Sequence, residues 1–198
     1  MVINYLGLSA FRLQINGTSI LLDPPDEAGG LKLPRMQNDL VIYSRAGAGV
    51  KNDKAFAIDS PGEYEVKEIF IYGLEAEGGR LIYLIETENM RLVHLGGLSQ
   101  TRLTPEQLER LEGADVLFIP VGGGNSLTAK QAAELVGQLE PRLVIPMNYK
   151  IPGVKLKLDS VDDFKKEVGG KFETMDKLKL ARKDLPEEET NFVIINPA

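Results

Sequence analysis

The hydrophobic pattern of this chain changes its period near residue 95, and this change most constrains the fold. Before it, short apolar or β-branched runs alternate with turn residues, which is typical of β-strands. Asn-Gly, Gly-Gly and Glu-Asn pairs at 16–17, 78–79 and 88–89 indicate turns between strands. Strands are predicted over 2–6, 11–15, 19–22, 39–43, 55–58, 68–72, 80–86 and 90–95. A single flat sheet of so many strands would curl or split.

After residue 95, helices with clear start signals alternate with apolar strands. The segments 104–107 and 128–131 are capping boxes, which predict helices to about Leu111 and Leu139, and Ser160 begins a third helix to about Val168. The runs 115–120 and 142–147 are continuously apolar, the pattern of strands buried on both faces. The segments 177–181 and 191–195 are predicted to be closing strands on either side of the charged loop 182–190.

Two sheets packed face to face with helices outside would bury both kinds of strand. The expected fold class is therefore α+β, a four-layer αββα sandwich. No Ser-rich or Pro-rich linker and no fixed repeat interrupts the chain, so residues 1–198 are predicted to form a single domain.

Charge and terminal composition narrow the classes of function. The formal charge is −6 with acidic and basic residues interspersed, so no broad cationic field is present for nucleic acid or a membrane surface. The N-terminal residues do not resemble a secretory signal, and no apolar run reaches the ~18 residues of a membrane helix. We expect a cytoplasmic protein with no nucleic-acid and no membrane partner.

A series of motifs occurs in order over the first 150 residues. The motifs are LGLSAFRL at 6–13, ILLDP at 20–24, DLVIYS at 39–44, SPGEYEV at 60–66, HLGGL at 94–98, PVGGG at 120–124 and IPMNYK at 145–150. This series resembles the metallo-β-lactamase superfamily, and SPGEYEV resembles its small Zn-dependent hydrolase-like branch. The resemblance implies the αββα fold and, in active members, hydrolysis at a metal centre.

The same resemblance implies that the metal ligands are replaced. In place of the family pattern T-H-x-H-x-D-H, the chain has Ser44 followed by unrelated residues, and its HLGGL motif lacks the metal-bridging aspartate of H-L-G-D-L. The positions where the ligands would stand are held by Arg45, Gly47, Gly49, Val50, Gly97 and Asn148. Glycine and valine cannot coordinate zinc, and arginine stays protonated and repels it. The chain has one histidine, His94, and no cysteine. We therefore expect no metal, no cofactor and no catalytic residue.

Several residues have alternative roles. His94 is a candidate general base or a packed residue at a strand end, and Ser44 a candidate nucleophile or a turn cap. We favour the structural role for both. Arg45 is equally consistent with a solvated loop residue and with a cation at the vacated metal position.

Two ion-binding sites can be considered around the same cleft. A modest anion site would comprise Arg45, Lys51, Asn148 and Lys150, and the glycine-rich loop 122–126 could add backbone donors. A hard cation could in principle be held by Asp23, Asp53, Asp59 and Glu63, although turn or capping roles are expected for these side chains.

The sequence predicts a metal-free and non-catalytic protein of this fold, with a binding or scaffold role in the vestigial cleft. Its partner would be a small molecule or a protein, and self-association into a homo-oligomer stays open. The alternative is a hydrolase of small ester, lactone or phosphoester substrates with an atypical or absent metal site.

Overall fold

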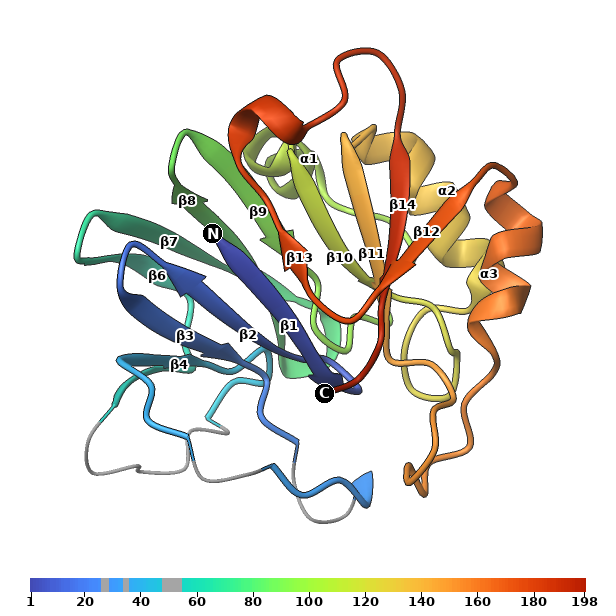
Figure 1. Ribbon diagram of the computed structural model, residues 1–198, viewed down its shortest axis with the longest axis horizontal. Coiled ribbons are helices and arrows are strands. Elements are labelled where there is room, and N and C mark those ends of the chain that lie inside the picture. The colour runs from blue at the N-terminus through green and yellow to red at the C-terminus, as the bar shows by residue number, and fades with distance from the viewer. Residues whose placement is uncertain (26–28, 34–35, 48–54) are drawn as a thin grey trace.

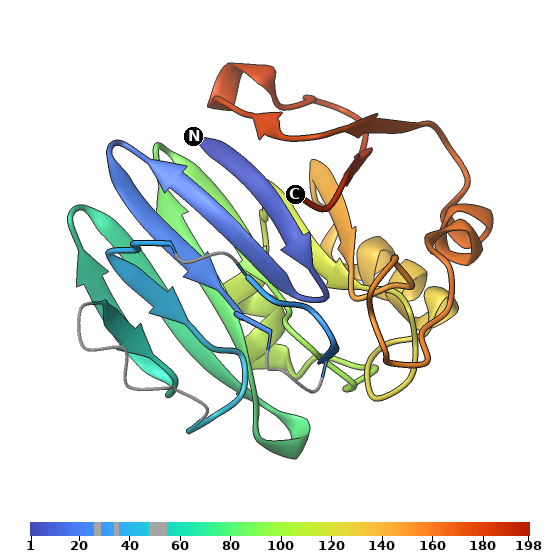
Figure 2. The ribbon, with the colours of Figure 1, turned by 60° about the horizontal axis from the view of Figure 1, so that its bottom comes forward.

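The computed structural model describes residues 1–25, 29–33, 36–47 and 55–198, which form two β-sheets packed face to face with helices beside the larger sheet (Figures 1 and 2). The six-stranded sheet has the order β13-β1-β2-β3-β4-β5. Its strands are β1 (Val2–Gly7), β2 (Ala10–Ile15), β3 (Thr18–Leu22), β4 (Leu40–Ile42), β5 (Phe56–Ile58) and β13 (Leu178–Lys179).

The eight-stranded sheet has the order β12-β14-β11-β10-β9-β8-β7-β6. Its strands are β6 (Gly62–Val66), β7 (Ile69–Ala76), β8 (Arg80–Thr87), β9 (Met90–His94), β10 (Val116–Pro120), β11 (Leu143–Met147), β12 (Phe172–Met175) and β14 (Asn191–Ile195). Strands β6 to β9 are antiparallel, whereas β9, β10, β11 and β14 run parallel to one another. The parallel half begins where the hydrophobic period changes.

Local signals fix the hairpins and the helices. The turn between β8 and β9 places Glu88 and Asn89 at φ values of 49° and 58°, as a tight hairpin requires. Helices α1 (Pro105–Leu111) and α2 (Ala129–Leu139) each begin with the predicted capping box, and Ser160 accepts a hydrogen bond from the Asp162 amide at the start of α3 (Val161–Val168). These predicted elements are confirmed.

Two strands were not predicted from the sequence. Strand β6 has a charged, largely exposed sequence, and its strand conformation comes from pairing with β7 at the edge of the sheet. Strand β12 is short and polar and pairs only with β14 among the described strands. The closing strand predicted over 177–181 is shorter, since only Leu178–Lys179 pairs with β1. The segments Glu77–Gly79 and Arg182–Asp184, predicted as turn and loop, form short 3-10 helices.

The core is divided between the interior of the sandwich and the outer faces of the sheets. Strands β10 and β11 are buried along their whole length, because one face meets the other sheet and the other face meets helices. On the outer face of the six-stranded sheet, the loop residues Leu33 and Met36 cover an apolar cluster that includes Leu21, Val41 and Tyr43. The α+β sandwich is thus confirmed. The described helices lie against the larger sheet, and described loop residues cover the smaller one.

Among the described residues, no helix is both long enough and apolar enough to cross a membrane.

Candidate functional site

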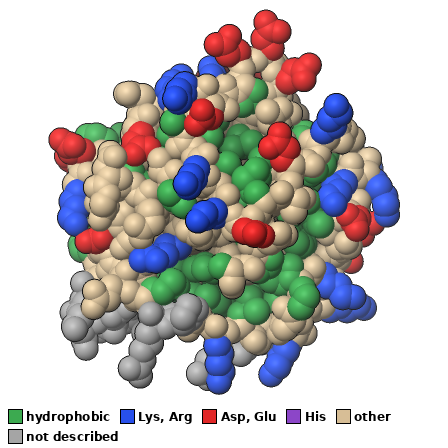
Figure 3. All heavy atoms as spheres, in the orientation of Figure 1, with side chains coloured by type: hydrophobic (Ala, Val, Ile, Leu, Met, Phe, Trp, Pro, Cys, Tyr) green, Lys and Arg blue, Asp and Glu red, His purple; other side chains and the backbone are tan. Residues whose placement is uncertain are grey.

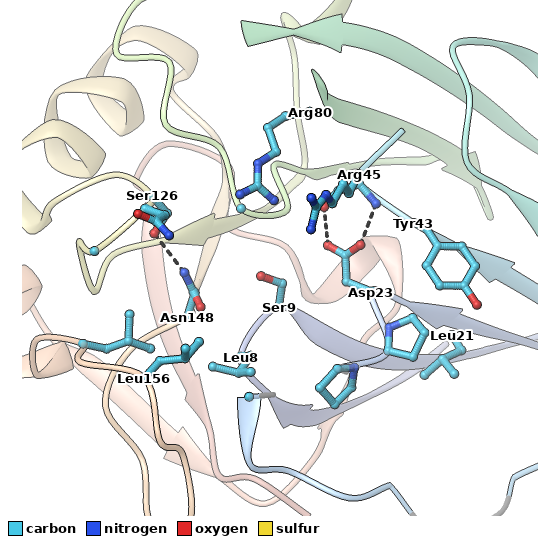
Figure 4. A pocket seen from close by; sticks show the side chains of 18 of the residues that line it. Leu8, Ser9, Leu21, Asp23, Tyr43, Arg45, Arg80, Ser126, Asn148 and Leu156 are labelled. Carbon is cyan, nitrogen blue, oxygen red and sulfur yellow. Dashed lines mark hydrogen bonds between the residues drawn. The ribbon is translucent and has the colours of Figure 1, made fainter. Parts of the chain in front are cut away.

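A cavity of about 1030 Å³ opens where several strands end (Figure 4). Asp23 follows β3, Ser44 lies just after β4, Gly97 follows β9 and Asn148 follows β11. The lining residues are Leu8, Ser9, Leu21, Asp23, Pro24, Pro25, Gly29, Val41, Tyr43, Ser44, Arg45, Arg80, Gly97, Gly124, Asn125, Ser126, Asn148, Leu156, Lys157 and Leu158. The crevice beyond the carboxyl ends of parallel strands is where sheets of this kind commonly bind ligands.

Asp23 is the centre of a hydrogen-bonded network at one side of the cavity. Its carboxylate accepts hydrogen bonds from the Ser44 amide and from the Ser44 hydroxyl, each at 2.6 Å. Nε2 of His94 lies 2.9 Å from Asp23 Oδ2. The network therefore joins the ends of β3, β4 and β9, and it connects the two sheets.

The two candidate catalytic side chains are committed to this network. The His94 side chain is 1% exposed and meets Phe11 and Phe118 edge-on, and it is not among the residues that line the cavity. The Ser44 hydroxyl donates to Asp23, while His94 uses Nε2 toward the same carboxylate. This geometry does not give the serine an imidazole base, so it favours the structural roles of both residues.

Gly96 allows the loop after β9 to lie directly on this network. Its φ is +54°, and a Cβ atom added there would lie 2.0 Å from Ser44 Oγ and 3.1 Å from Asp23 Oδ2. Neither the backbone conformation nor the space suits a side chain. The HLGGL motif therefore needs its first glycine for packing, independently of any metal.

Arg80 and Arg45 form the basic side of the cavity. Residues 44–46 pair with residues 79–81: Arg45 and Arg80 form an antiparallel bridge, and the Leu81 amide donates to the Ser44 carbonyl at 2.7 Å. This pairing brings both arginines to the cavity wall (Figure 4). Neither guanidinium forms an ion pair with a carboxylate in the part of the chain that the structure describes.

The Arg80 guanidinium lies against Gly97. A Cβ atom added at Gly97 would be 3.0 Å from Arg80 Nη1 and 3.4 Å from Cζ. By the family resemblance, Gly97 stands where the metal-bridging aspartate would be, so a side-chain cation lies beside the position of that lost ligand. From the sequence, residues 78–80 are predicted only as a turn and the start of a strand. Arg80 was missed because its approach to Gly97 depends on long-range strand pairing.

Asn148 has a mainly architectural environment. Its φ is 53°, its amide donates to the Leu8 carbonyl at 2.8 Å, and its side-chain Nδ2 donates to Ser126 Oγ at 2.8 Å. Ser126 in turn donates to the Gly123 carbonyl at 2.9 Å. The asparagine therefore ties the glycine-rich loop 122–126 to the end of β11.

The other predicted site residues have different placements. Gly47 lies in an exposed turn and Lys150 is exposed, and neither is among the residues that line the cavity. Gly49, Val50, Lys51 and Asp53 lie outside the described residues. Their assignment to the site stays a prediction. Among the predicted anion-binding residues, the structure brings Arg45 and Asn148 to the same cavity.

The residues that the structure describes do not fit a family metal site. In the described ranges, no group of three or more His, Cys, Asp or Glu side chains is arranged to hold a metal ion. Glu63, one of the candidate hard-cation ligands, instead pairs with Arg110 at 2.7 Å on the surface. Arg45 and Gly97 supply no donor for a cation, and the guanidinium beside Gly97 would repel one.

Three non-glycine residues with positive φ meet at this cavity. They are Leu8 at 54°, Asp23 at 42° and Asn148 at 53°. Strained backbone of this kind costs about 1–3 kcal/mol per residue and is concentrated at ligand sites in proteins. Here, the strained positions place Leu8, Asp23 and Asn148 around one opening.

Apolar side chains make up much of the remaining described lining, here called the apolar wall. They are Leu8, Leu21, Pro24, Pro25, Val41, Tyr43, Leu156 and Leu158, of which Leu21, Val41 and Tyr43 are buried. Leu156 is 47% exposed, which makes it one of the few large apolar side chains that the described surface leaves in water. In Figure 3, apolar side chains gather low on the face shown, where the loops 29–33 and 150–158 lie in Figure 1.

Tyr83 supports this wall from the core. Its hydroxyl donates to the Tyr43 carbonyl at 3.0 Å. Burial raises the pKa of the Tyr83 hydroxyl well above its ordinary value, so the group remains a neutral donor. Tyr43 is therefore held in place by a buried hydrogen bond.

Comparisons with known proteins identify similar sequences and folds. The family profile described as beta-lactamase superfamily domain matches residues 2–148. A UPF0173 protein of Pyrococcus furiosus is 28% identical over 200 residues, which cover 85% of this chain and 90% of that protein. A protein of Thermococcus onnurineus named UPF0173 metal-dependent hydrolase is 24% identical over 216 residues, which cover 87% of this chain and 94% of that protein.

A solved structure from Thermotoga maritima has a TM-score of 0.83 and 32% identity, with 99% of this chain and 100% of that chain covered. That protein is provisionally named a Zn-dependent hydrolase of the metallo-beta-lactamase superfamily. Igni18, a metallo hydrolase of Ignicoccus hospitalis, aligns with a TM-score of 0.64 at 20% identity and shows the fold alone.

Proposed function

The chain belongs to the metallo-β-lactamase superfamily, and we propose that it binds a small anionic molecule in the cavity without metal-dependent hydrolysis. The observation that carries this proposal is the Arg80 guanidinium against Gly97. It places a fixed positive charge in the part of the cleft where, by the family resemblance, the metal-bridging carboxylate is missing. A second cation, Arg45, lines the same wall.

Charge balance around the cavity supports an anion. Among the described lining residues, Arg45, Arg80 and Lys157 are cationic. Asp23 is the acidic side chain of that described lining, and it already accepts from Ser44 and contacts His94. A guanidinium offers several fixed donors that match a carboxylate or a phosphate. A ligand with one such group would give Arg80 and Arg45 a counter-charge.

The proposal is tested with protein purified without chelators and then studied in EDTA. We expect less than stoichiometric zinc, manganese or iron by elemental analysis. In ¹H–¹⁵N spectra recorded in EDTA, acetate and inorganic phosphate should shift the Nε–Hε resonances of Arg80 and Arg45 and the amides of residues 95–98. Neutral acetamide is the control and should leave them unchanged. A stoichiometric metal, or shifts that appear only after zinc is added, would overturn the proposal.

A second candidate function is hydrolysis of a small ester, lactone or phosphoester. It is favoured by the name of the Thermococcus onnurineus relative, a metal-dependent hydrolase. The arrangement of Ser44 and His94 around Asp23 does not favour it, because both side chains are already hydrogen-bonded to the carboxylate. Generic ester and phosphodiester substrates with and without EDTA distinguish the two functions: turnover lost in EDTA would support a metal-dependent hydrolase.

A further inference from the structure

We propose that the ligand of this cavity is an amphipathic carboxylate. Its acidic head contacts Arg80 and Arg45, and its alkyl body lies on the apolar wall. This inference rests on the proposed function and adds to it the chemical class of the ligand. It follows from the two arginines and the apolar side chains that line one cavity, to which Lys157, between Leu156 and Leu158, adds a third cation.

The head-group side of the cavity is charged but compact. Arg45 and Arg80 are neighbours across a strand bridge, so both can approach one small acidic group. Asn148 directs its side-chain amide to Ser126, and Ser44 donates to Asp23, so these nearby polar side chains are already engaged. Ser9, Asn125 and Lys157 also line the cavity, so a ligand can carry further polar atoms beside its acidic group.

The apolar side is larger than a simple anion needs. Leu8, Pro24, Pro25, Leu156 and Leu158 are partly or largely exposed and line the same space as the arginines. A 47% exposed Leu156 contributes a hydrophobic surface that a ligand could cover. The volume of about 1030 Å³ is at the upper end of the range of about 300–1,000 Å³ for small-molecule sites. Acetate or phosphate would leave most of this space in contact with water.

A binding series with straight-chain carboxylates tests the inference. Isothermal titration in EDTA would compare acetate, butanoate, hexanoate and octanoate. We expect the affinity to rise with length, by up to about fourfold for each methylene that becomes buried. Octanamide, which has a similar body without the charge, should bind at least tenfold more weakly than octanoate.

Two matched variants locate the alkyl chain. Leu156→Gln should reduce the increase in affinity from hexanoate to octanoate and leave the affinity for acetate unchanged. Phe70→Gln is the control, because Phe70 is also a large exposed apolar residue, at 42%, and does not line the cavity. It should bind the whole series like the original protein.

The outcomes separate the inference from the function on which it rests. Carboxylates that all bind with similar affinity would overturn the amphipathic ligand and leave an anion site. Octanamide and octanoate binding equally well would contradict the anion site itself. Equal losses of octanoate affinity in the Leu156 and Phe70 variants would overturn the assignment of the alkyl chain to the apolar wall.

Discussion

The two polar clusters of the cavity differ in whether their groups already have partners. On one side, Asp23 accepts two hydrogen bonds from Ser44 and contacts His94, and Gly96 packs on the group. On the other side, the guanidinium of Arg80 lies over Gly97 without a carboxylate partner among the described residues. The Asp23 network stabilises the fold through three contacts to one carboxylate, although His94 Nδ1 is buried without a hydrogen-bond partner among the described residues. Cations without a described partner at a cavity surface are available to a ligand. Gly96 and Gly97, which are adjacent in the HLGGL motif, thus have different surroundings.

The largest effect is expected at Asp23, the centre of the hydrogen-bonded network. Asp23→Ala should lower the free energy of unfolding by about 3 kcal/mol or more, because the Ser44 amide and hydroxyl and the His94 ring would lose their acceptor. Urea denaturation followed by circular dichroism measures the change. A loss below about 1 kcal/mol would show that the network contributes little to stability.

The two glycines of the HLGGL motif should respond differently to the same substitution. Gly96→Ala places a methyl group 2.0 Å from Ser44 Oγ at a positive φ, and it should cost about 1–3 kcal/mol or more in stability. Gly97→Ala meets only the end of the Arg80 side chain at 3.0 Å, which can move, so it should cost less than about 1 kcal/mol. Thermal unfolding of the two alanine variants measures this difference in stability. Equal losses would remove the structural distinction between the two positions.

Removing the Arg80 charge, which has no carboxylate partner among the described residues, should weaken ligand binding and leave stability nearly unchanged. Arg80→Gln removes a charge-assisted hydrogen bond worth about 1.5–3 kcal/mol, which corresponds to about a 10- to 150-fold loss of octanoate affinity. Its free energy of unfolding should change by no more than about 0.5 kcal/mol. Arg102→Gln is the control, since Arg102 is exposed and outside the cavity lining. Similar losses in both variants would indicate a general charge effect.

The smallest effect concerns the support of the apolar wall. Tyr83→Phe removes the donor to the Tyr43 carbonyl and should lower stability by about 1 kcal/mol, with octanoate affinity within about twofold. Chemical denaturation and titration calorimetry measure the two quantities. A large loss of octanoate affinity would show that the position of Tyr43 affects ligand binding as well as stability.

The sequence predicts much of the fold and less of the site, for a physical reason. Capping boxes at Thr104 and Thr128 and the apolar runs of β10 and β11 are local signals, and the structure contains each of these elements. Strand β6 and the Arg45–Arg80 bridge depend on pairing between distant segments, which a local pattern does not encode. The resemblance predicts which positions lack metal ligands, and this assignment stays a prediction. It could not indicate that Arg80 would lie beside one of them.

The most direct measurement restores an acidic side chain at Gly97. In Gly97→Asp, the new carboxylate would pair with the Arg80 guanidinium, whereas Gly97→Asn adds a side chain of nearly the same size without charge. Both are titrated with octanoate in EDTA. We predict that the aspartate variant loses at least tenfold in affinity and that the asparagine variant stays within about threefold of the original protein. Equal affinities in the two variants would contradict the claim that Arg80 supplies the ligand-binding charge of this cavity.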